Sequence, residues 1–208
     1  AGATIIGLDP GWLMELAAPD GKVTSIAVRL ADGADAQAVR GDIAALLRLI
    51  GLGHPKTLMF DEIYYVKDAY SLWHLGYEGS WAANSDAAFA NGNFSGLSTE
   101  AAYVVHPQLG KWLIGAGMEV FGPSSSFGWR VMPAIAGILT VILLTRLTMR
   151  LTRSPLLAGL AGLLLAIDGV ALTESRIGLL DVFIGFFATL TLYCLVRDRE
   201  WSRARLAR

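Results

Sequence analysis

The sequence predicts an all-α integral membrane protein with three transmembrane helices toward its C-terminal end. Hydrophobic residues make up 54% of the 208 residues and the mean hydropathy is +0.49, more apolar than a soluble domain usually is. Three stretches carry no charge, residues 131–145, 155–167 and 182–196. With its flanks, each reaches the roughly 20 residues that a helix needs to cross a bilayer. The net charge of -1 argues against a nucleic-acid-binding protein.

The chain ahead of these stretches divides into three parts. Residues 1–40 have no clear structure in the sequence, apart from turn signals and a β-like run over residues 22–30. Residues 41–53 hold a short apolar helix that is too short to span unaided, and we interpret it as the remnant of a first membrane helix. Residues 54–130 are predicted to form a loop outside the membrane, ahead of the three spans within residues 131–208.

Two amphipathic helices are predicted within this loop. Residues 63–79 are rich in tyrosine and tryptophan, which are typical of membrane interfaces. Residues 109–121 carry apolar side chains at helical spacing, and a length of roughly 13 residues suits a helix that lies on the membrane. Residues 80–100 between them are rich in glycine, alanine, asparagine and serine, which predicts a loop.

Basic residues orient the chain in the bilayer. Arg146, Arg150 and Arg153 follow the first predicted span, and five further arginines follow the third. Because basic residues favour the cytoplasmic side, residues 54–130 and the turn at residues 173–176 are predicted to share the extracytoplasmic face. We therefore expect a multi-pass protein of the plasma membrane whose polar chemistry lies outside the cell.

The adjacent carboxylates Asp61 and Glu62 are candidate catalytic residues. They lie between an apolar segment and the aromatic helix, where partial desolvation suits a general base. The alternative is a solvated helix start with Asp61 as the N-cap. The gathering of other ionisable groups on the same membrane face favours the catalytic interpretation.

Four basic residues are candidates for binding a phosphate at the depth of the lipid headgroups. Arg130 lies at the outer mouth of the first span and Arg176 at the turn after the second. Either guanidinium could make a bidentate phosphate contact or could simply anchor a helix end. His106 and Lys111 lie at the start of the second amphipathic helix, where a phosphate contact or a positioning role is predicted.

Two carboxylates near the third span are expected to be structural or to contribute to a polar site inside the bundle. Glu174 and Asp181 are seven residues apart. A carboxylate in an apolar run costs on the order of 3 kcal/mol to insert, so Asp181 should face the protein interior, with Arg176 as the nearest partner. The sequence has no HExxH or P-loop pattern, and neither a tightly bound metal nor a cofactor is expected.

These segments, taken in order, resemble the bacterial protein O-mannosyltransferases of glycosyltransferase family 39, membrane enzymes of the GT-C class that use lipid-phosphate sugar donors. The matching segments are Gly51–Pro55, Phe60–Tyr65, His106–Lys111, Phe127–Arg130, Glu174–Arg176 and Leu179–Asp181. The resemblance covers residues 50 to 200. It implies GT-C-type transmembrane helices with interfacial helices in the first external loop.

The resemblance also implies a reaction. A Ser or Thr hydroxyl of a secreted or membrane protein would attack C1 of mannose on a polyprenyl-phosphate carrier, with inversion at that carbon. Asp61 would be the general base, and Glu62 would orient Asp61 or the acceptor. The leaving phosphate needs cationic stabilisation and no acid, which suits Arg130 and Arg176.

The sequence departs from the family in places, and two alternatives stay open. Members of the family are much longer, so the chain is expected to be an N-terminal fragment. Val104 or Val105 stands where eukaryotic relatives have an aspartate, and Gln108 replaces a usual proline. One alternative is a GT-C transferase for another lipid-linked sugar or acceptor. The other is a non-catalytic membrane fragment whose charges only pack helices.

Overall fold

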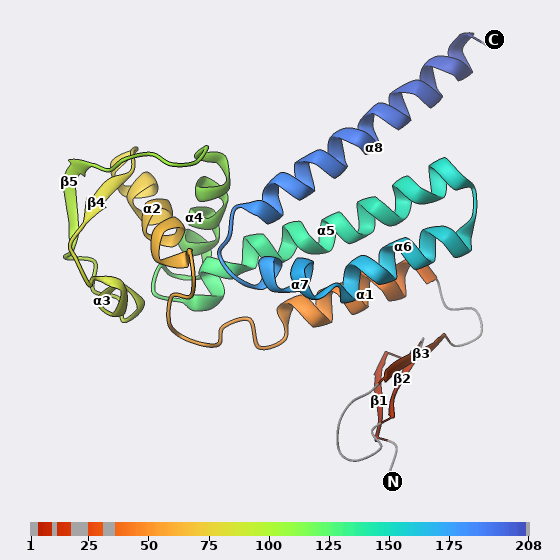
Figure 1. Cartoon of the computed structure of the whole chain (residues 1–208), viewed down its shortest axis with the longest axis horizontal. Coiled ribbons are helices and arrows are strands. Elements are labelled where there is room, and N and C mark those ends of the chain that lie inside the picture. The colour runs from red at the N-terminus through yellow and green to blue at the C-terminus, as the bar shows by residue number, and fades with distance from the viewer. Residues whose placement is uncertain (1–3, 10–11, 18–24, 31–35, 207–208) are drawn as a thin grey trace.

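The computed structural model of the chain describes the backbone of residues 4–9, 12–17, 25–30 and 36–206 and the side chains of residues 41–206. Helices dominate (Figure 1). The described helices are α1 (Ala36–Leu49), α2 (Glu62–Leu75), α3 (Asp86–Ala90), α4 (Leu109–Phe121), α5 (Ser126–Thr152), α6 (Pro155–Ile167), α7 (Gly169–Arg176) and α8 (Asp181–Leu206). The described strands are β1 (Thr4–Asp9), β2 (Trp12–Ala17), β3 (Ser25–Leu30), β4 (Gly79–Trp81) and β5 (Leu97–Ala101).

Two small antiparallel sheets correct the expectation of an all-α fold. Strands β1, β2 and β3 pair in that order, and β3 falls within the predicted β-like run, whose residues 22–24 lie outside the described residues. Strands β4 and β5 pair across the stretch that was expected to be a loop, with α3 between them. The sequence of residues 80–100 did not predict this hairpin, because its small polar residues lack the apolar alternation that is typical of a strand.

The membrane-spanning prediction is met in part. Among the described residues, α5 is the one single helix that is long and apolar enough to cross a bilayer, with 27 residues. Helices α6 and α7 pass the same test together but bend by 56° at the break between them. Helix α8 does not meet this criterion. Its apolar part is too short, because Asp181 lies at one end of it and the charged residues Arg197 and Asp198 at the other. The described residues therefore contain one helix that can span a membrane, or two spans if the bent pair forms one span. The sequence had predicted three spans.

A helical bundle forms around α5. Helices α1, α6, α7 and α8 all contact α5, and Figure 1 shows α1 and α6 running beside it. Ala44, Val141 and Ala166 are fully buried where α1, α5 and α6 meet, since small side chains let the helices approach closely. Helix α1 begins at Ala36, before the predicted remnant, and packs as a full member of this bundle.

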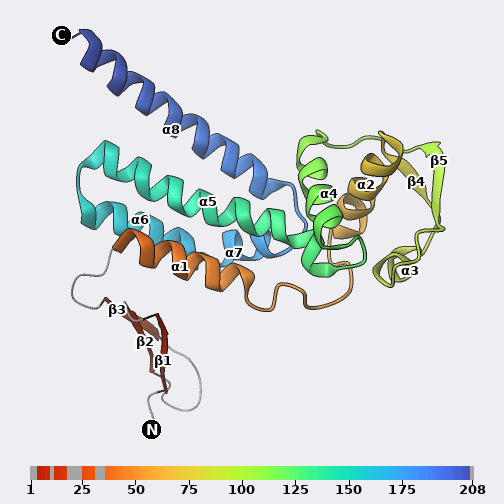
Figure 2. The same ribbon diagram turned by 180° about the vertical axis from the view of Figure 1, so that it is seen from behind.

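A second group of elements gathers at the N-terminal end of α5. Helices α2 and α4 pack on one another, α4 packs on α5, and the β4–β5 hairpin lies beside α2 (Figure 2). Their shared core includes Val66, Phe89, Ile114, Met118 and Trp129, all nearly or fully buried. Both predicted amphipathic helices are confirmed as α2 and α4, and both belong to this group.

Candidate functional site

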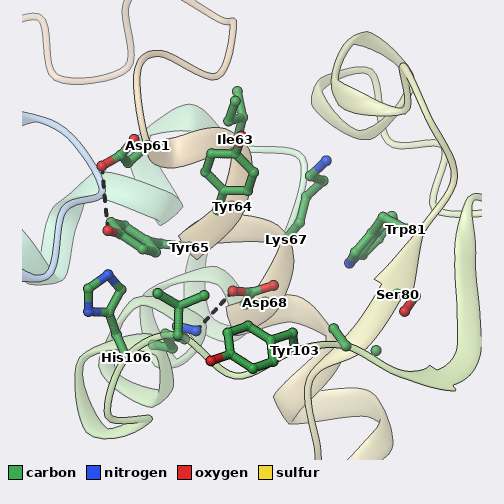
Figure 3. Close-up of a pocket in the computed structure, with 14 residues that line it drawn as sticks. Asp61, Ile63, Tyr64, Tyr65, Lys67, Asp68, Ser80, Trp81, Tyr103 and His106 are labelled. Atoms are coloured by element: carbon green, nitrogen blue, oxygen red, sulfur yellow. Dashed lines mark hydrogen bonds and ion pairs between the residues drawn. The ribbon is translucent and has the colours of Figure 1, made fainter.

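A cavity of about 550 Å³ lies between α2 and β4 (Figure 3). Its lining comes from the start of α2, from β4, and from the segment that leads into α4. The charged and polar lining residues are Asp61, Tyr64, Tyr65, Lys67, Asp68, Ser80, Tyr103, His106 and Lys111. The cavity thus brings together three of the predicted site residues, Asp61, His106 and Lys111.

Asp61 holds the position expected for a base. It occupies the N-cap of α2, but its side chain makes no capping hydrogen bond, so the solvated N-cap alternative is not adopted. The Tyr65 hydroxyl donates to Asp61 Oδ2 at 3.4 Å, a long contact that leaves the carboxylate largely free. The preceding residue, Phe60, has a φ of 50°, a region that non-glycine residues seldom adopt. Asp61, which follows this turn, is half-buried and lines the cavity.

Tyr65 stays a neutral hydrogen-bond donor beside Asp61. Burial, and then the negative charges of Asp61 and Asp181, raise the pKa of the Tyr65 phenol above its ordinary value of 10.0. The ring of Tyr65 meets the edge of the His106 imidazole, with 5.5 Å between ring centroids. Tyr65 therefore connects the candidate base to the start of α4.

Glu62 has an environment opposite to that of Asp61. It is fully buried, and its carboxylate accepts hydrogen bonds from the backbone N–H groups of Met59 (2.9 Å) and Gly178 (2.7 Å). Arg130 donates to both of its oxygens from Nε and Nη2, each at 2.7 Å. These four bonds occupy the carboxylate, which lies outside the cavity lining. The contacts favour a positioning role for Glu62, joining α2 to α5 and to the loop before α8.

Arg130 is buried in the protein interior, where its guanidinium is hydrogen-bonded to other parts of the chain. Its guanidinium is 1% exposed and, besides Glu62, donates to the carbonyl oxygens of Leu52 (3.3 Å), Pro55 (2.9 Å) and Thr57 (3.0 Å). The phosphate-binding prediction for Arg130 is not supported by these contacts, because its donors already have partners. The sequence placed this arginine at the start of the first span but could not reveal its partner Glu62, which lies 68 residues away.

Lys111 is also buried and paired. Its ammonium lies 2.9 Å from Asp68 Oδ2 and 2.8 Å from Glu78 Oε2, and it is 1% exposed. Its charge is thus compensated by two carboxylates on α2 and on the approach to β4. The contacts favour a structural role over a phosphate contact. Sequence reasoning missed Asp68 and Glu78, which lie 43 and 33 residues from Lys111 and belong to no motif.

The remaining predicted residues lie away from this cavity. Arg176 donates to the carbonyl oxygens of Leu47 and Ile50, so it caps the C-terminal end of α1. Among the ion pairs of residues 41–206 there is none between Arg176 and Asp181, in contrast to the expected partnership. Glu174 lies on α7, where the sequence predicted a turn.

A second cavity, of about 420 Å³, adjoins the first. It lies between the start of α4 and α8, and its lining is mostly apolar: Pro107, Leu109, Gly110, Leu180, Phe183, Ile184, Phe187 and Ala188, together with Asp181 and Thr191. Both cavities are lined by Tyr65 and His106, so these two residues form the boundary between them. Within the described part of the chain, no group of three or more histidine, cysteine or carboxylate side chains is placed to hold a metal ion.

Several known proteins are similar in sequence to this chain. The profile of the family described as dolichyl-phosphate-mannose-protein mannosyltransferase matches residues 39–206. The polyprenol-phosphate-mannose–protein mannosyltransferase of Mycolicibacterium smegmatis is 38% identical over 167 residues, which are 79% of this chain and 29% of the relative. Its namesake in Corynebacterium glutamicum is 37% identical over 152 residues, 72% of this chain and 26% of the relative. The namesake in Mycobacterium tuberculosis is 33% identical over 169 residues, 79% and 28% of the two chains.

The chain therefore spans less than a third of the length of these relatives. No solved structure matches it.

Proposed function

Because the chain belongs to the dolichyl-phosphate-mannose-protein mannosyltransferase family, we propose that it forms part of an enzyme that transfers mannose from polyprenyl-phosphate-mannose to proteins. The acceptors are Ser and Thr hydroxyls of secreted or membrane proteins. The reaction takes place at the extracytoplasmic face of the plasma membrane, in a protein with several spans. One observation carries the proposal: Asp61 is a half-buried carboxylate on a cavity wall, with a single long hydrogen bond.

The proposed chemistry is one displacement at C1 of mannose. Asp61 accepts the proton of the acceptor hydroxyl while the hydroxyl oxygen attacks C1. The bond between C1 and the phosphate oxygen breaks, and polyprenyl phosphate leaves with the electron pair. A single displacement inverts the anomeric carbon. The Tyr65 hydroxyl supports this step, since it donates to Asp61 Oδ2 and leaves the other oxygen without a partner among residues 41–206.

The leaving phosphate is assigned to the boundary between the two cavities. His106 is exposed there, and the structure gives its side chain no hydrogen-bond partner among residues 41–206, whereas Arg130 and Lys111 are compensated by carboxylates. A His106 N–H can donate to a phosphate oxygen as charge develops on it. The apolar second cavity beside it suits the first isoprene units of the carrier, because its walls offer little but hydrocarbon.

The test is mannose transfer by the complete gene product, with polyprenyl-phosphate-mannose as donor and a Ser/Thr-rich peptide as acceptor. Asp61→Asn removes the base and is expected to lower kcat by about 10² to 10⁴. Asp168→Asn is the matched control, because Asp168 is an exposed N-cap of α7 and asparagine serves there equally well. Equal rates in wild type and Asp61→Asn would refute the base assignment. Transfer of another lipid-linked sugar, with none of mannose, would favour a different GT-C enzyme.

A further inference from the structure

The part of the first cavity between α2 and β4 is called the trough. Its walls are Tyr64 and Lys67 on α2, Ser80 and Trp81 on the hairpin, and Tyr103 on the segment after β5 (Figure 3). The trough extends from Asp61 on the side away from the apolar second cavity, whose lining includes none of these five residues. A ligand in the trough would therefore approach Asp61 from a separate direction.

Trp81 lines the trough and carries an unused hydrogen-bond donor. Its indole ring makes an edge contact with Phe89 (5.3 Å between centroids) and a tilted contact with Tyr70 (5.9 Å). Its Nε1 is buried and has no hydrogen-bond partner among the described residues. In Figure 3 this nitrogen lies on the side of the ring that faces α2. A buried N–H without a partner is unfavourable, so the site is suited to a ligand that brings an acceptor such as a carbonyl oxygen.

The segment after β5 offers an apolar surface beside that donor. Tyr103 is 89% exposed and Val105 65%, and both line the trough. Ala102 makes the last backbone hydrogen bond of the hairpin, to the Glu78 carbonyl, and residues 103–105 make none with the described part of the chain. Exposed apolar side chains on an extended backbone with free polar groups are typical of a surface that another chain covers.

The cationic groups of the trough are already paired. Lys67 pairs with Asp86 at 2.6 Å, and Lys111 pairs with both Asp68 (2.9 Å) and Glu78 (2.8 Å). Asp61 makes only a long contact, to a neutral hydroxyl, among the described residues. The described part of the trough therefore offers no free cation to an anionic ligand. A ligand that fits carries hydrogen-bond acceptors and side chains in place of an anionic group, as a stretch of polypeptide does.

We propose that this trough binds the acceptor polypeptide in an extended conformation, with a backbone carbonyl accepting from Trp81 Nε1 and side chains packing on Tyr103 and Val105. The proposal rests on the function proposed above. The acceptor hydroxyl then reaches Asp61 from the trough, while the lipid-linked sugar reaches it from the boundary at Tyr65 and His106. Trp81 and Tyr103 act as specificity residues toward the protein substrate.

The experiment compares Trp81→Phe with wild type in the complete gene product. Phenylalanine keeps an aromatic ring between Tyr70 and Phe89 but removes the N–H, so the KM for a Ser/Thr-rich peptide should rise about three- to tenfold, the range expected for one neutral hydrogen bond. The KM for polyprenyl-phosphate-mannose should not change. Trp73→Phe is the control, because the Trp73 indole also donates a hydrogen bond, to the Trp112 carbonyl, but lies outside both cavities.

Tyr103→Ala is a second test variant. It should fold normally, because a side chain that is 89% exposed contributes little to the core. It too should raise the peptide KM. A raised donor KM in either variant would instead place the sugar in the trough and overturn the proposal, as would a peptide KM that neither variant changes.

Peptide binding without donor separates this proposal from the proposed function. Fluorescence polarisation of a labelled Ser/Thr-rich peptide should show weaker binding to Trp81→Phe than to wild type or Trp73→Phe. If wild type transfers mannose and Trp81→Phe binds the peptide normally, only the trough assignment fails. If wild type transfers no mannose but binds the peptide through Trp81, the trough stands and the proposed reaction fails.

Discussion

At the scale of single residues, two neighbouring acids have opposite environments. Asp61 faces a cavity with one long hydrogen bond, whereas Glu62 is buried with four bonds from three parts of the chain. The sequence predicted a catalytic role for this pair, because other ionisable groups were expected to gather on the same membrane face. It could not separate their roles, since the partners of Glu62 lie as far as 116 residues away.

Removing either member of the Glu62–Arg130 pair should strongly destabilise the protein. Glu62→Gln leaves a buried guanidinium without its counter-charge, and Arg130→Met leaves a buried carboxylate, so each should cost about 3 to 5 kcal/mol. The double variant should cost less than the sum, because both charges go together. Denaturation midpoints in detergent would measure this, with Arg150→Met as a control, since the Arg150–Glu200 pair is exposed. If the losses of the two single variants added up to the loss of the double variant, the two side chains would contribute to stability independently.

At the scale of the elements, the buried ammonium of Lys111 on α4 joins that helix to Asp68 on α2 and to Glu78 beside the hairpin. The sequence predicted both helices correctly from their aromatic content and apolar spacing. It did not predict the hairpin, because β4 and β5 are held by pairing between segments about 16 to 22 residues apart in a glycine- and serine-rich stretch. The break at Asp168 was also missed, although its carboxylate caps α7 through the Ala171 N–H at 2.8 Å.

The ion pairs made by Lys67 on α2 and by Lys111 on α4 should differ in their contribution to stability. Lys111→Met leaves Asp68 and Glu78 facing one another in a buried site, so a loss of about 3 to 5 kcal/mol is expected. Lys67→Met removes a pair whose Asp86 side chain is 43% exposed, and a loss of no more than about 1 kcal/mol is expected. Thermal unfolding of the two variants in the same detergent makes the comparison. Similar losses would mean that burial of the ion pair has no bearing on its contribution.

At the scale of the whole molecule, the catalytic candidates cluster at one end of the helical bundle. Asp61, His106 and both cavities lie beside α2, the start of α4 and the start of α8. Helices α4 and α8 both contact α5 (Figures 1 and 2). Charge topology had predicted that these residues share a membrane face. The number of spans was harder to predict, because apolar run length does not reveal a bend such as that between α6 and α7.

The predicted orientation can be tested in cells that express the complete gene product with Cys194 replaced by serine. A cysteine at the exposed Asn91, in the turn after α3, should react with an impermeant thiol reagent added from outside. A cysteine at Thr152, the last residue of α5, should react only after permeabilisation, because the arginines around it are expected in the cytoplasm. The reverse pattern of labelling would invert the proposed topology.

The boundary formed by Tyr65 and His106 has a consequence for the order of binding in the proposed reaction. Under the proposed function, the two cavities, which share these two residues, give the acceptor and the lipid-linked donor separate binding places. Either reactant can then bind first, and either product can leave first.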